Sequence, residues 1–366
     1  MQDQLTILTK WICQQALQLE KGEKLYISYG HEKTYPLLLP LIKEASSLGV
    51  FVYPELQNTE LEVYKRKHVP VEQISTMQIL EEAKIDFFDA FIYIKYSEND
   101  YESNALPLAK KTAINTALAH SVEVRANQKK WVLLNYPSVL DAYKSAMSYQ
   151  EFYAFALEAM TIDYQQLQQK IKPLKDLMEA TDRVHIIGPG TDLTFSIKGM
   201  PAIPCLGEKN IPDGEIYTAP VKESVEGTIT YNTPSPYQGN IYHHVSLTFA
   251  NGQIIKATSD EEKDLLTTIF ATDPGARYVG EFSLGLNKKI TKPMGDILYD
   301  EKIFGSIHFT PGAAYDDCDN GNKSAVHWDL VLIQTENFGG GEIYFDDVLI
   351  RKDGYFVLPA LQALNE

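Results

Sequence analysis

The residues best suited to chemistry lie between His308 and Asp329. The end of this stretch, Ser324–Ile333, is rich in β-branched and aromatic residues and predicts a β-strand. Because side chains alternate along a strand, His327 and Asp329 should share one face, while Trp328 points to the other. An imidazole beside a carboxylate can bind a zinc-like divalent ion. The same pair can also be a structural ion pair at a strand end, so this stretch alone leaves both interpretations open.

Two glutamates upstream have unusual neighbours. Glu215 follows the turn formed by residues 212–214, and Glu281 follows a glycine in a mainly apolar strand. A buried carboxylate without a partner is costly, so each needs a cation, an N-cap, a turn contact or a salt bridge. With the two histidines and the aspartate downstream, they supply two imidazoles and three carboxylates. A two-metal site needs about that inventory, with one bridging carboxylate. Glu301 could be a sixth ligand or a solvated surface charge.

Other catalytic types find little support. The chain has eight histidines but no HExxH zinc motif and no Gly-x-Ser-x-Gly nucleophile elbow. Cys318 lies in an acidic turn that would raise its thiol pKa, so a catalytic thiolate is not expected. The loop 188–192 lacks a third glycine and a Lys-Ser/Thr pair, which argues against nucleotide binding. His243 and His244 have no carboxylate at ligand spacing and are interpreted as surface strand residues.

Composition restricts the partners. The net charge of the 366 residues is −16, from 49 acidic and 33 basic residues, which argues against nucleic acid or an anionic membrane as a partner. No apolar run approaches the roughly 20 residues that span a bilayer, and the first residues lack the features of a signal peptide. The three scattered cysteines, Cys13, Cys205 and Cys318, form no disulfide framework or zinc knuckle. We therefore expect a cytoplasmic protein.

The elements that must position these residues change character near residue 180. Before it, amphipathic helical patterns alternate with short apolar runs, which predicts an α/β N-terminal domain of residues 1–180 with a parallel sheet. The main predicted helices are 2–20, 35–47, 73–85 and 165–180, and the predicted strands are 25–29, 50–54, 90–95 and 131–135.

After residue 181, short strands and turns dominate. Asn251-Gly252 is a strong hairpin signal between two predicted strands, 245–250 and 253–257. A second hairpin is predicted from 342–351 and 355–358, and one helix from 260–270. We predict an α+β C-terminal domain of residues 181–366 with a largely antiparallel sheet, which would carry the metal site and catalysis. No internal repeat is present.

Four ordered motifs in the second half together resemble peptidase family M29, the metallo-aminopeptidases of the thermophilic type. They are NIPDGEIYTAP at 210–220, GEFSLGLN at 280–287, DEKIFGSIH at 300–308 and HWDL at 327–330. Any one of them is unspecific, but their order and separations make the match specific. The α/β first half also fits the two-domain layout of this family.

The resemblance implies removal of N-terminal residues from peptides by two divalent metal ions per subunit, zinc, cobalt or magnesium/manganese. It also implies a homodimer whose two sites face an enclosed interior. Tyr315 carries over as a catalytic residue. One departure is Phe309–Gly312, where the family is expected to have something like Ile-Ala-Leu-Gly, and this bears on pocket shape. The metal ligands that carry over by motif position are Glu215, Glu281, His308, His327 and Asp329, and Glu301 carries over through a more variable spacing.

Two rival functions stay open at this point. One is a catalytically idle homologue that binds metal or peptide without turnover. The other is a two-metal phosphoesterase, against which count the missing phosphate loop and the few basic residues near the site, Lys209, Lys222 and Lys302. The side-chain preference, the native metal and the general base are not predicted.

Overall fold

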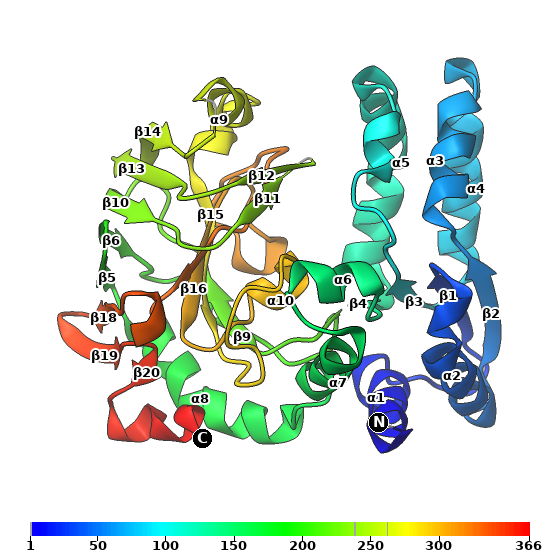
Figure 1. Cartoon of the computed structure of the whole chain (residues 1–366), viewed down its shortest axis with the longest axis horizontal. Coiled ribbons are helices and arrows are strands. Elements are labelled where there is room, and N and C mark those ends of the chain that lie inside the picture. Colours follow the sequence, from blue (N-terminus) through cyan, green and yellow to red (C-terminus); the bar gives the residue numbers. More distant parts are fainter. Residues whose placement is uncertain (1, 238, 262) are drawn as a thin grey trace. The chain divides into compact units, whose positions relative to one another are not determined.

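The computed structural model describes residues 2–237, 239–261 and 263–366 (Figure 1). The chain forms two compact units. The first runs to Thr161 and adds Gly207–Pro212, and the second contains Ile162–Leu206 and Asp213–Glu366. None of the helices in the described ranges has the length and apolarity needed to cross a bilayer.

The first unit is built on a parallel five-stranded sheet of order β2-β1-β3-β4-β8. Its strands are short apolar runs, and Ile27, Ile92 and Val132 are fully buried, as expected where helices cover a parallel sheet. The α/β prediction for this half is confirmed. The strands are β1 (Lys24–Tyr29), β2 (Phe51–Leu56), β3 (Ala90–Lys95), β4 (Lys130–Asn135) and β8 (Asn210–Ile211).

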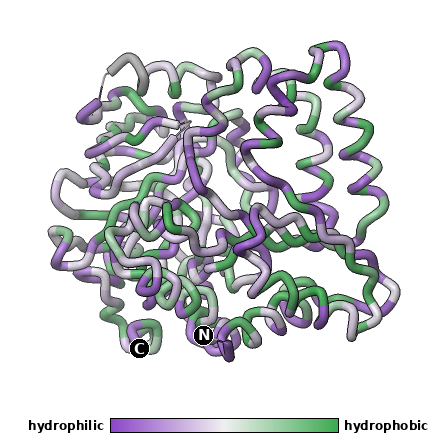
Figure 2. The backbone as a smooth tube through the Cα atoms, turned by 45° about the vertical axis from the view of Figure 1, so that its right-hand side comes forward, coloured by the Kyte–Doolittle hydropathy of each residue, from purple (hydrophilic) through white to green (hydrophobic). Residues whose placement is uncertain are grey.

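The helices of the first unit include two that the sequence did not predict. These are α3 (Thr59–His68) and α5 (Leu108–Gln128). Figure 2 shows hydrophilic and hydrophobic residues intermixed along the helices of the chain. In α3 only Val63 is buried, so its apolar face is narrow and weakly marked in the sequence. The other helices are α1 (Gln2–Lys10), continued by a π-helical segment (Trp11–Ala16), α2 (Tyr35–Ser47), α4 (Ile74–Phe87), α6 (Val139–Lys144) and α7 (Tyr149–Met160).

The second unit is a sandwich of two antiparallel sheets. An eight-stranded sheet has the order β14-β13-β10-β6-β5-β18-β19-β20, and a five-stranded sheet has the order β17-β16-β15-β9-β7. Phe195 of the larger sheet packs against Phe282 and Phe309 of the smaller one, with ring centroids 5.0 Å apart in both pairs. The predicted antiparallel α+β fold is confirmed.

The bounds of these elements follow. The larger sheet contains β5 (Arg183–Gly188), β6 (Thr191–Ser196), β10 (Glu226–Thr230), β13 (Ser246–Ala250), β14 (Gln253–Thr258), β18 (Glu342–Phe345), β19 (Val348–Lys352) and β20 (Tyr355–Phe356). The smaller contains β7 (Ile203–Cys205), β9 (Glu215–Thr218), β15 (Val279–Gly285), β16 (Ser306–Pro311) and β17 (Val331–Ile333). A hairpin of β11 (Ser235–Tyr237) and β12 (Asn240–Tyr242) and the helices α8 (Tyr164–Ala180), α9 (Lys263–Phe270) and α10 (Ile297–Asp300) complete the unit.

Three local features differ from the sequence-based expectation. Helix α8 lies in the second unit, where its residues Ile171 and Leu174 join the sandwich core, whereas the predicted boundary placed it in the first half. The segment 342–351 is itself a hairpin, because Asp346 and Asp347 adopt positive φ and turn the chain. The strand predicted over Ser324–Ile333 is regular only in β17, from Val331.

Candidate metal centre

The pleat of the smaller sheet separates a core face from a polar face. Across β9, β15 and β16, Tyr217 pairs with Ser283, and Ser283 pairs with His308. These three residues and Glu281 lie on the polar face, because side chains two apart on a strand share a face. The residues between them, Ile216, Phe282 and Phe309, belong to the sandwich core. A buried apolar layer therefore supports the polar cluster from below.

Two glycines let the segments that carry the site approach closely. A Cβ atom on Gly280 would lie 2.2 Å from the carbonyl oxygen of Ala313. A Cβ atom on Gly312 would lie 2.0 Å from the carbonyl oxygen of Val326, and Gly312 also has a φ of 113°. A side chain at either position would collide with these carbonyl oxygens, and the positive φ of Gly312 also favours glycine. The two glycines therefore let the segment that carries Glu281 approach Ala313, and let the end of β16 approach Val326.

His327 and Asp329 reach the polar face from extended backbone before β17. Their neighbours Val326 and Leu330 are in the core, and Trp328 packs against Tyr242 with ring centroids 5.1 Å apart. The predicted alternation in this stretch is therefore confirmed, although the strand is shorter than predicted. The buried Trp328 side chain therefore holds its two neighbours, His327 and Asp329, on the polar face.

The structure brings all six predicted ligand residues together. His308 Nε2 lies 2.9 Å from Glu281 Oε1 and 3.6 Å from Glu215 Oε2. His327 Nε2 lies 3.5 Å from Glu281 Oε2 and 3.3 Å from Asp329 Oδ1. Two sets of potential ligands result, and they share Glu281, with one carboxylate oxygen directed to each. A further set contains Glu301, His308 and Asp329, and within every set the ligand atoms lie within 4.8 Å of one another.

The donor atoms fit divalent ions. His327 Nδ1 donates a hydrogen bond to the carbonyl oxygen of Ala313 at 2.9 Å, so Nε2 is the nitrogen that faces the carboxylates and would bind an ion once it has lost its proton. That Nε2 atom is buried without a hydrogen-bond partner among the described residues, as is His308 Nδ1. Glu215 and Glu281 are 4% and 3% exposed. Crowded, buried carboxylates and an unsatisfied imidazole nitrogen are costly unless a cation completes the cluster.

The pKa values of the clustered side chains also indicate that a cation would stabilise the cluster. Burial lowers the pKa of His308, but Glu215 and Glu281 outweigh it and raise that pKa to about 10. Burial also lowers the pKa of His327, but Asp329 and Glu281 raise it to about 10. Burial raises the pKa of Glu301 to about 8, despite the favourable charge of Lys302. The cluster therefore needs positive charge, which protons supply in the ion-free chain and divalent ions would supply instead.

Hydroxyl groups orient two of the carboxylates. Ser283 Oγ donates to Glu215 Oε2 at 3.0 Å, and Thr310 Oγ1 donates to Asp329 Oδ1 at 2.8 Å. Such outer partners fix the orientation of metal ligands. Neither hydroxyl residue was predicted from the sequence. Each stands two positions after a predicted ligand on the same strand, so the alternation rule could have identified them.

Lys302 is the largest departure from expectation. From the sequence this lysine is expected only as a basic residue near the site, but it is 1% exposed. Its ammonium contacts Glu215 Oε1 and lies 2.8 Å from Glu301 Oε1 and 3.4 Å from Asp213 Oδ1. Lysine is almost never fully buried unless it is paired. The lysine is thus part of the cluster.

Tyr315 lies at the edge of the centre. Its ring centroid is 4.9 Å from that of His327 and 5.6 Å from that of Tyr217, and the residue is 47% exposed. Partial burial and the carboxylates of Glu281 and Asp329 hold its pKa above the ordinary value, so the hydroxyl keeps its proton. The phenol can therefore donate a hydrogen bond to a molecule at the site.

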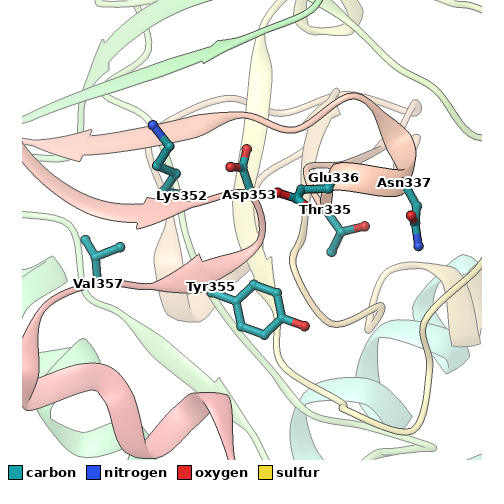
Figure 3. A pocket seen from close by; sticks show the side chains of 7 residues that line it. All are labelled: Thr335, Glu336, Asn337, Lys352, Asp353, Tyr355 and Val357. Carbon is teal, nitrogen blue, oxygen red and sulfur yellow. The ribbon is translucent and has the colours of Figure 1, made fainter.

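Two other features lie outside the centre. His243 and His244 pair with the exposed carboxylates of Glu261 and Asp260, at 2.7 and 2.6 Å, and neither joins a set of three possible ligands in the described ranges. A pocket of about 480 Å³ opens elsewhere in the second unit (Figure 3), but its lining includes none of the predicted site residues. It is lined by Thr335, Glu336, Asn337, Lys352, Asp353, Tyr355 and Val357.

Comparison with solved structures identifies the fold. Wild-type AmpT from Thermus thermophilus superposes with a TM-score of 0.81 at 21% identity, over 97% of this chain and 99% of that one. A 2,5-dihydroxypyridine dioxygenase from Pseudomonas putida KT2440 superposes with a TM-score of 0.61 at 14% identity, over 99% of both chains. At such identities these matches show a shared fold and leave the chemistry open.

Comparison of sequences identifies the family. Aminopeptidase 2 of Geobacillus stearothermophilus is 22% identical over 92% of both chains. Aminopeptidase AmpS of Bacillus subtilis is 30% identical, but that alignment spans only 46% of this chain and 43% of AmpS. The family described as thermophilic metalloprotease (M29) matches residues 1–356. The resemblance carried by the four motifs is confirmed, and the chain belongs to the M29 family of metallopeptidases.

Proposed function

We propose that the chain is an aminopeptidase that uses two divalent metal ions to hydrolyse the first peptide bond of its substrates. One observation carries this proposal. Glu281 belongs to two sets of potential ligands and directs a different carboxylate oxygen toward a histidine of each set. A carboxylate shared in this way suits a pair of neighbouring ions. The names of the related aminopeptidases support the choice of an exopeptidase.

The proposed ligands divide between two positions. Glu215, Glu281 and His308 would hold one ion, and Glu281, His327 and Asp329 would hold the other. Glu301 lies within ligand distance of His308 and Asp329 and would complete the centre. When bound, such ions lower the pKa of coordinated water from about 15.7 toward about 7 and polarise the scissile carbonyl. Imidazole with several carboxylates suits zinc, cobalt or manganese, and magnesium where supply favours it.

The side chains around the centre have separate roles in this proposal. The phenol of Tyr315 donates a hydrogen bond to the oxyanion that develops on the substrate carbonyl, and the protonated state of its hydroxyl permits this. The excess of carboxylates favours the cationic α-amine of a peptide, which would give specificity for the N-terminal residue. Ser283 and Thr310 hold Glu215 and Asp329 in place while this happens.

Removal of metal provides the first test. A chelator should abolish hydrolysis of aminoacyl-anilides, and added zinc, cobalt or manganese should restore it, because the chain's own groups supply no replacement for the ions. Elemental analysis of the same samples should find about two ions per active chain. Full activity in protein shown to be metal-free would exclude the proposal.

The same assay separates the rivals when a phosphate ester is added to the substrate panel. Hydrolysis of the ester but not of the anilides would indicate a phosphoesterase. Metal binding without turnover of either substrate would indicate an idle homologue. Cleavage of anilides that carry a free amine, and not of N-acetylated ones, would support aminopeptidase specificity.

Assembly as a homodimer and a cytoplasmic location complete the proposal. Cys13, Cys205 and Cys318 are all free, which suits a reducing compartment. Light scattering at micromolar concentration should give about twice the 41.3 kDa chain mass. A stable monomer with full activity would contradict the dimer. If the sites face an enclosed interior, short peptides should be cut and folded proteins should not.

A further inference from the structure

Behind the two ligand sets, the second unit contains a pocket of acidic groups occupied by the ammonium of Lys302. Asp213, Glu215 and Glu301 surround it, with the distances given above, and Asp213 is only 2% exposed. A buried ammonium has three donors, and here three different carboxylates lie within ion-pair distance of it.

A thiol lies at the same pocket. Strand β7 pairs with β9 so that Cys205 stands opposite Glu215. The sulfur of Cys205 and carboxylate oxygens of Asp213 and Glu215 lie within 4.8 Å of one another, a spacing at which three groups could hold a metal ion. Two of these three groups ion-pair with Lys302. The ammonium therefore takes the place that a cation would have.

The polypeptide holds both sides of this arrangement through one residue, Asn287. Asn287 is fully buried, its backbone N–H donates to the carbonyl of Lys302 at 3.0 Å, and its Nδ2 donates to the carbonyl of Asp213 at 2.8 Å. Lysine and aspartate are thus held at a set separation. This accounts for the asparagine that ends the second sequence motif.

The consequence for the metal centre lies in the two oxygens of Glu215. Its Oε1 contacts Lys302, while its Oε2 accepts from Ser283 at 3.0 Å and lies 3.6 Å from His308 Nε2. The lysine thereby turns one oxygen away from the centre and leaves the other facing it. Glu301 likewise contacts both sides, because its Oε1 is paired with Lys302 and the residue also belongs to the set with His308 and Asp329.

We propose that Lys302 is a positioning residue that acts as a fixed third cation, filling the pocket of Asp213, Glu215, Glu301 and Cys205 so that exchangeable ions bind only at the two ligand sets. This inference rests on the proposed two-metal function. It predicts that the pocket becomes a metal site when the ammonium is removed. Because Cys205 would be a ligand there, the new site should prefer a thiophilic ion, with the thiol losing its proton on binding.

The test compares cadmium binding by the wild-type chain and Lys302→Met, which keeps a long side chain without the charge. By equilibrium dialysis with elemental analysis, Lys302→Met should bind one cadmium ion more per chain than the wild type. The additional ion should produce an ultraviolet thiolate-to-cadmium charge-transfer band. Lys302→Arg keeps the charge and should show neither. Cys205→Ala in the Lys302→Met background should remove the band and weaken the additional ion.

The outcomes distinguish this inference from the proposed function. A wild-type chain that binds no ions contradicts the two-metal proposal, whatever the variants do. A wild-type chain that binds two, with Lys302→Met also binding two and showing no band, overturns the role of Lys302 alone. Should Lys302→Met not fold, Lys302→Gln carries the same test, because the glutamine is uncharged, can still donate hydrogen bonds to the carboxylates, and leaves Cys205, Asp213 and Glu215 in place.

Discussion

Replacing Glu281 by glutamine should remove metal from both proposed positions and abolish peptide hydrolysis. Glu281 is the group shared by the two ligand sets, and it faces His308 Nε2 at 2.9 Å and His327 Nε2 at 3.5 Å. The amide keeps the size of the side chain but loses the charge and one acceptor oxygen. Changes to outer partners typically weaken metal binding by about 10–100-fold, so loss of a shared ligand should exceed that range.

Glu261→Gln is the matched control for this variant. Glu261 also pairs with a histidine, His243 at 2.7 Å, but on the surface and away from the centre. Elemental analysis and dialysis should show wild-type metal content in the control and little metal in Glu281→Gln, while circular dichroism shows both folded. Two tightly bound ions in folded Glu281→Gln would mean that the ions are held elsewhere.

The sequence predicted the ligand residues through the four ordered motifs and, for His327 and Asp329, also through local alternation. In the strands that carry Glu281 and His308, apolar residues alternate with polar ones, and this period of two places the polar residues on one face. The alternation around Trp328 similarly placed His327 and Asp329. The order of the four motifs identified the candidate ligands, and the period of two explains why the structure brings them onto one face.

The same rules could not reveal Lys302 or the position of α8. Lysine is normally exposed, and nothing in the run 300–302 indicates which of its charges is buried. The burial of Lys302 depends on Asp213, far away in sequence, and on the brace from Asn287. Helix α8 has a clear apolar face, but only the fold decides which core that face enters. Both features arise from long-range packing.

The fold by itself would not have decided the function. Wild-type AmpT and a dihydroxypyridine dioxygenase both share it over nearly the whole chain, and their names denote different chemistries. The choice between such chemistries lies in the side chains on the polar face of β9, β15 and β16. Here these side chains offer two sets of potential ligands with a shared carboxylate, and a tyrosine lies beside them. Experiments on single side chains are therefore the most informative.

Tyr315→Phe should lower kcat by about 10²–10³-fold, or roughly 2.7–4 kcal/mol, with little change in KM. The phenylalanine ring keeps the contacts with His327 and Tyr217, whose ring centroids lie 4.9 and 5.6 Å away, so only the hydroxyl is lost. A hydrogen bond made mainly in the transition state affects kcat and kcat/KM alike. Metal content should stay at the wild-type value, because the phenol is not a proposed ligand.

Tyr217→Phe provides the comparison that isolates this role. Tyr217 lies on the same polar face, but the residue is only 8% exposed and its hydroxyl already donates to Asp317 Oδ1 at 2.7 Å, so this hydroxyl is not available to a substrate. Its removal should change kcat far less than removal of the Tyr315 hydroxyl, which belongs to a residue 47% exposed. A near-normal kcat in Tyr315→Phe would mean that Tyr315 only packs against its neighbours. Loss of metal in that variant would mean that its hydroxyl helps to hold the metal ligands in place.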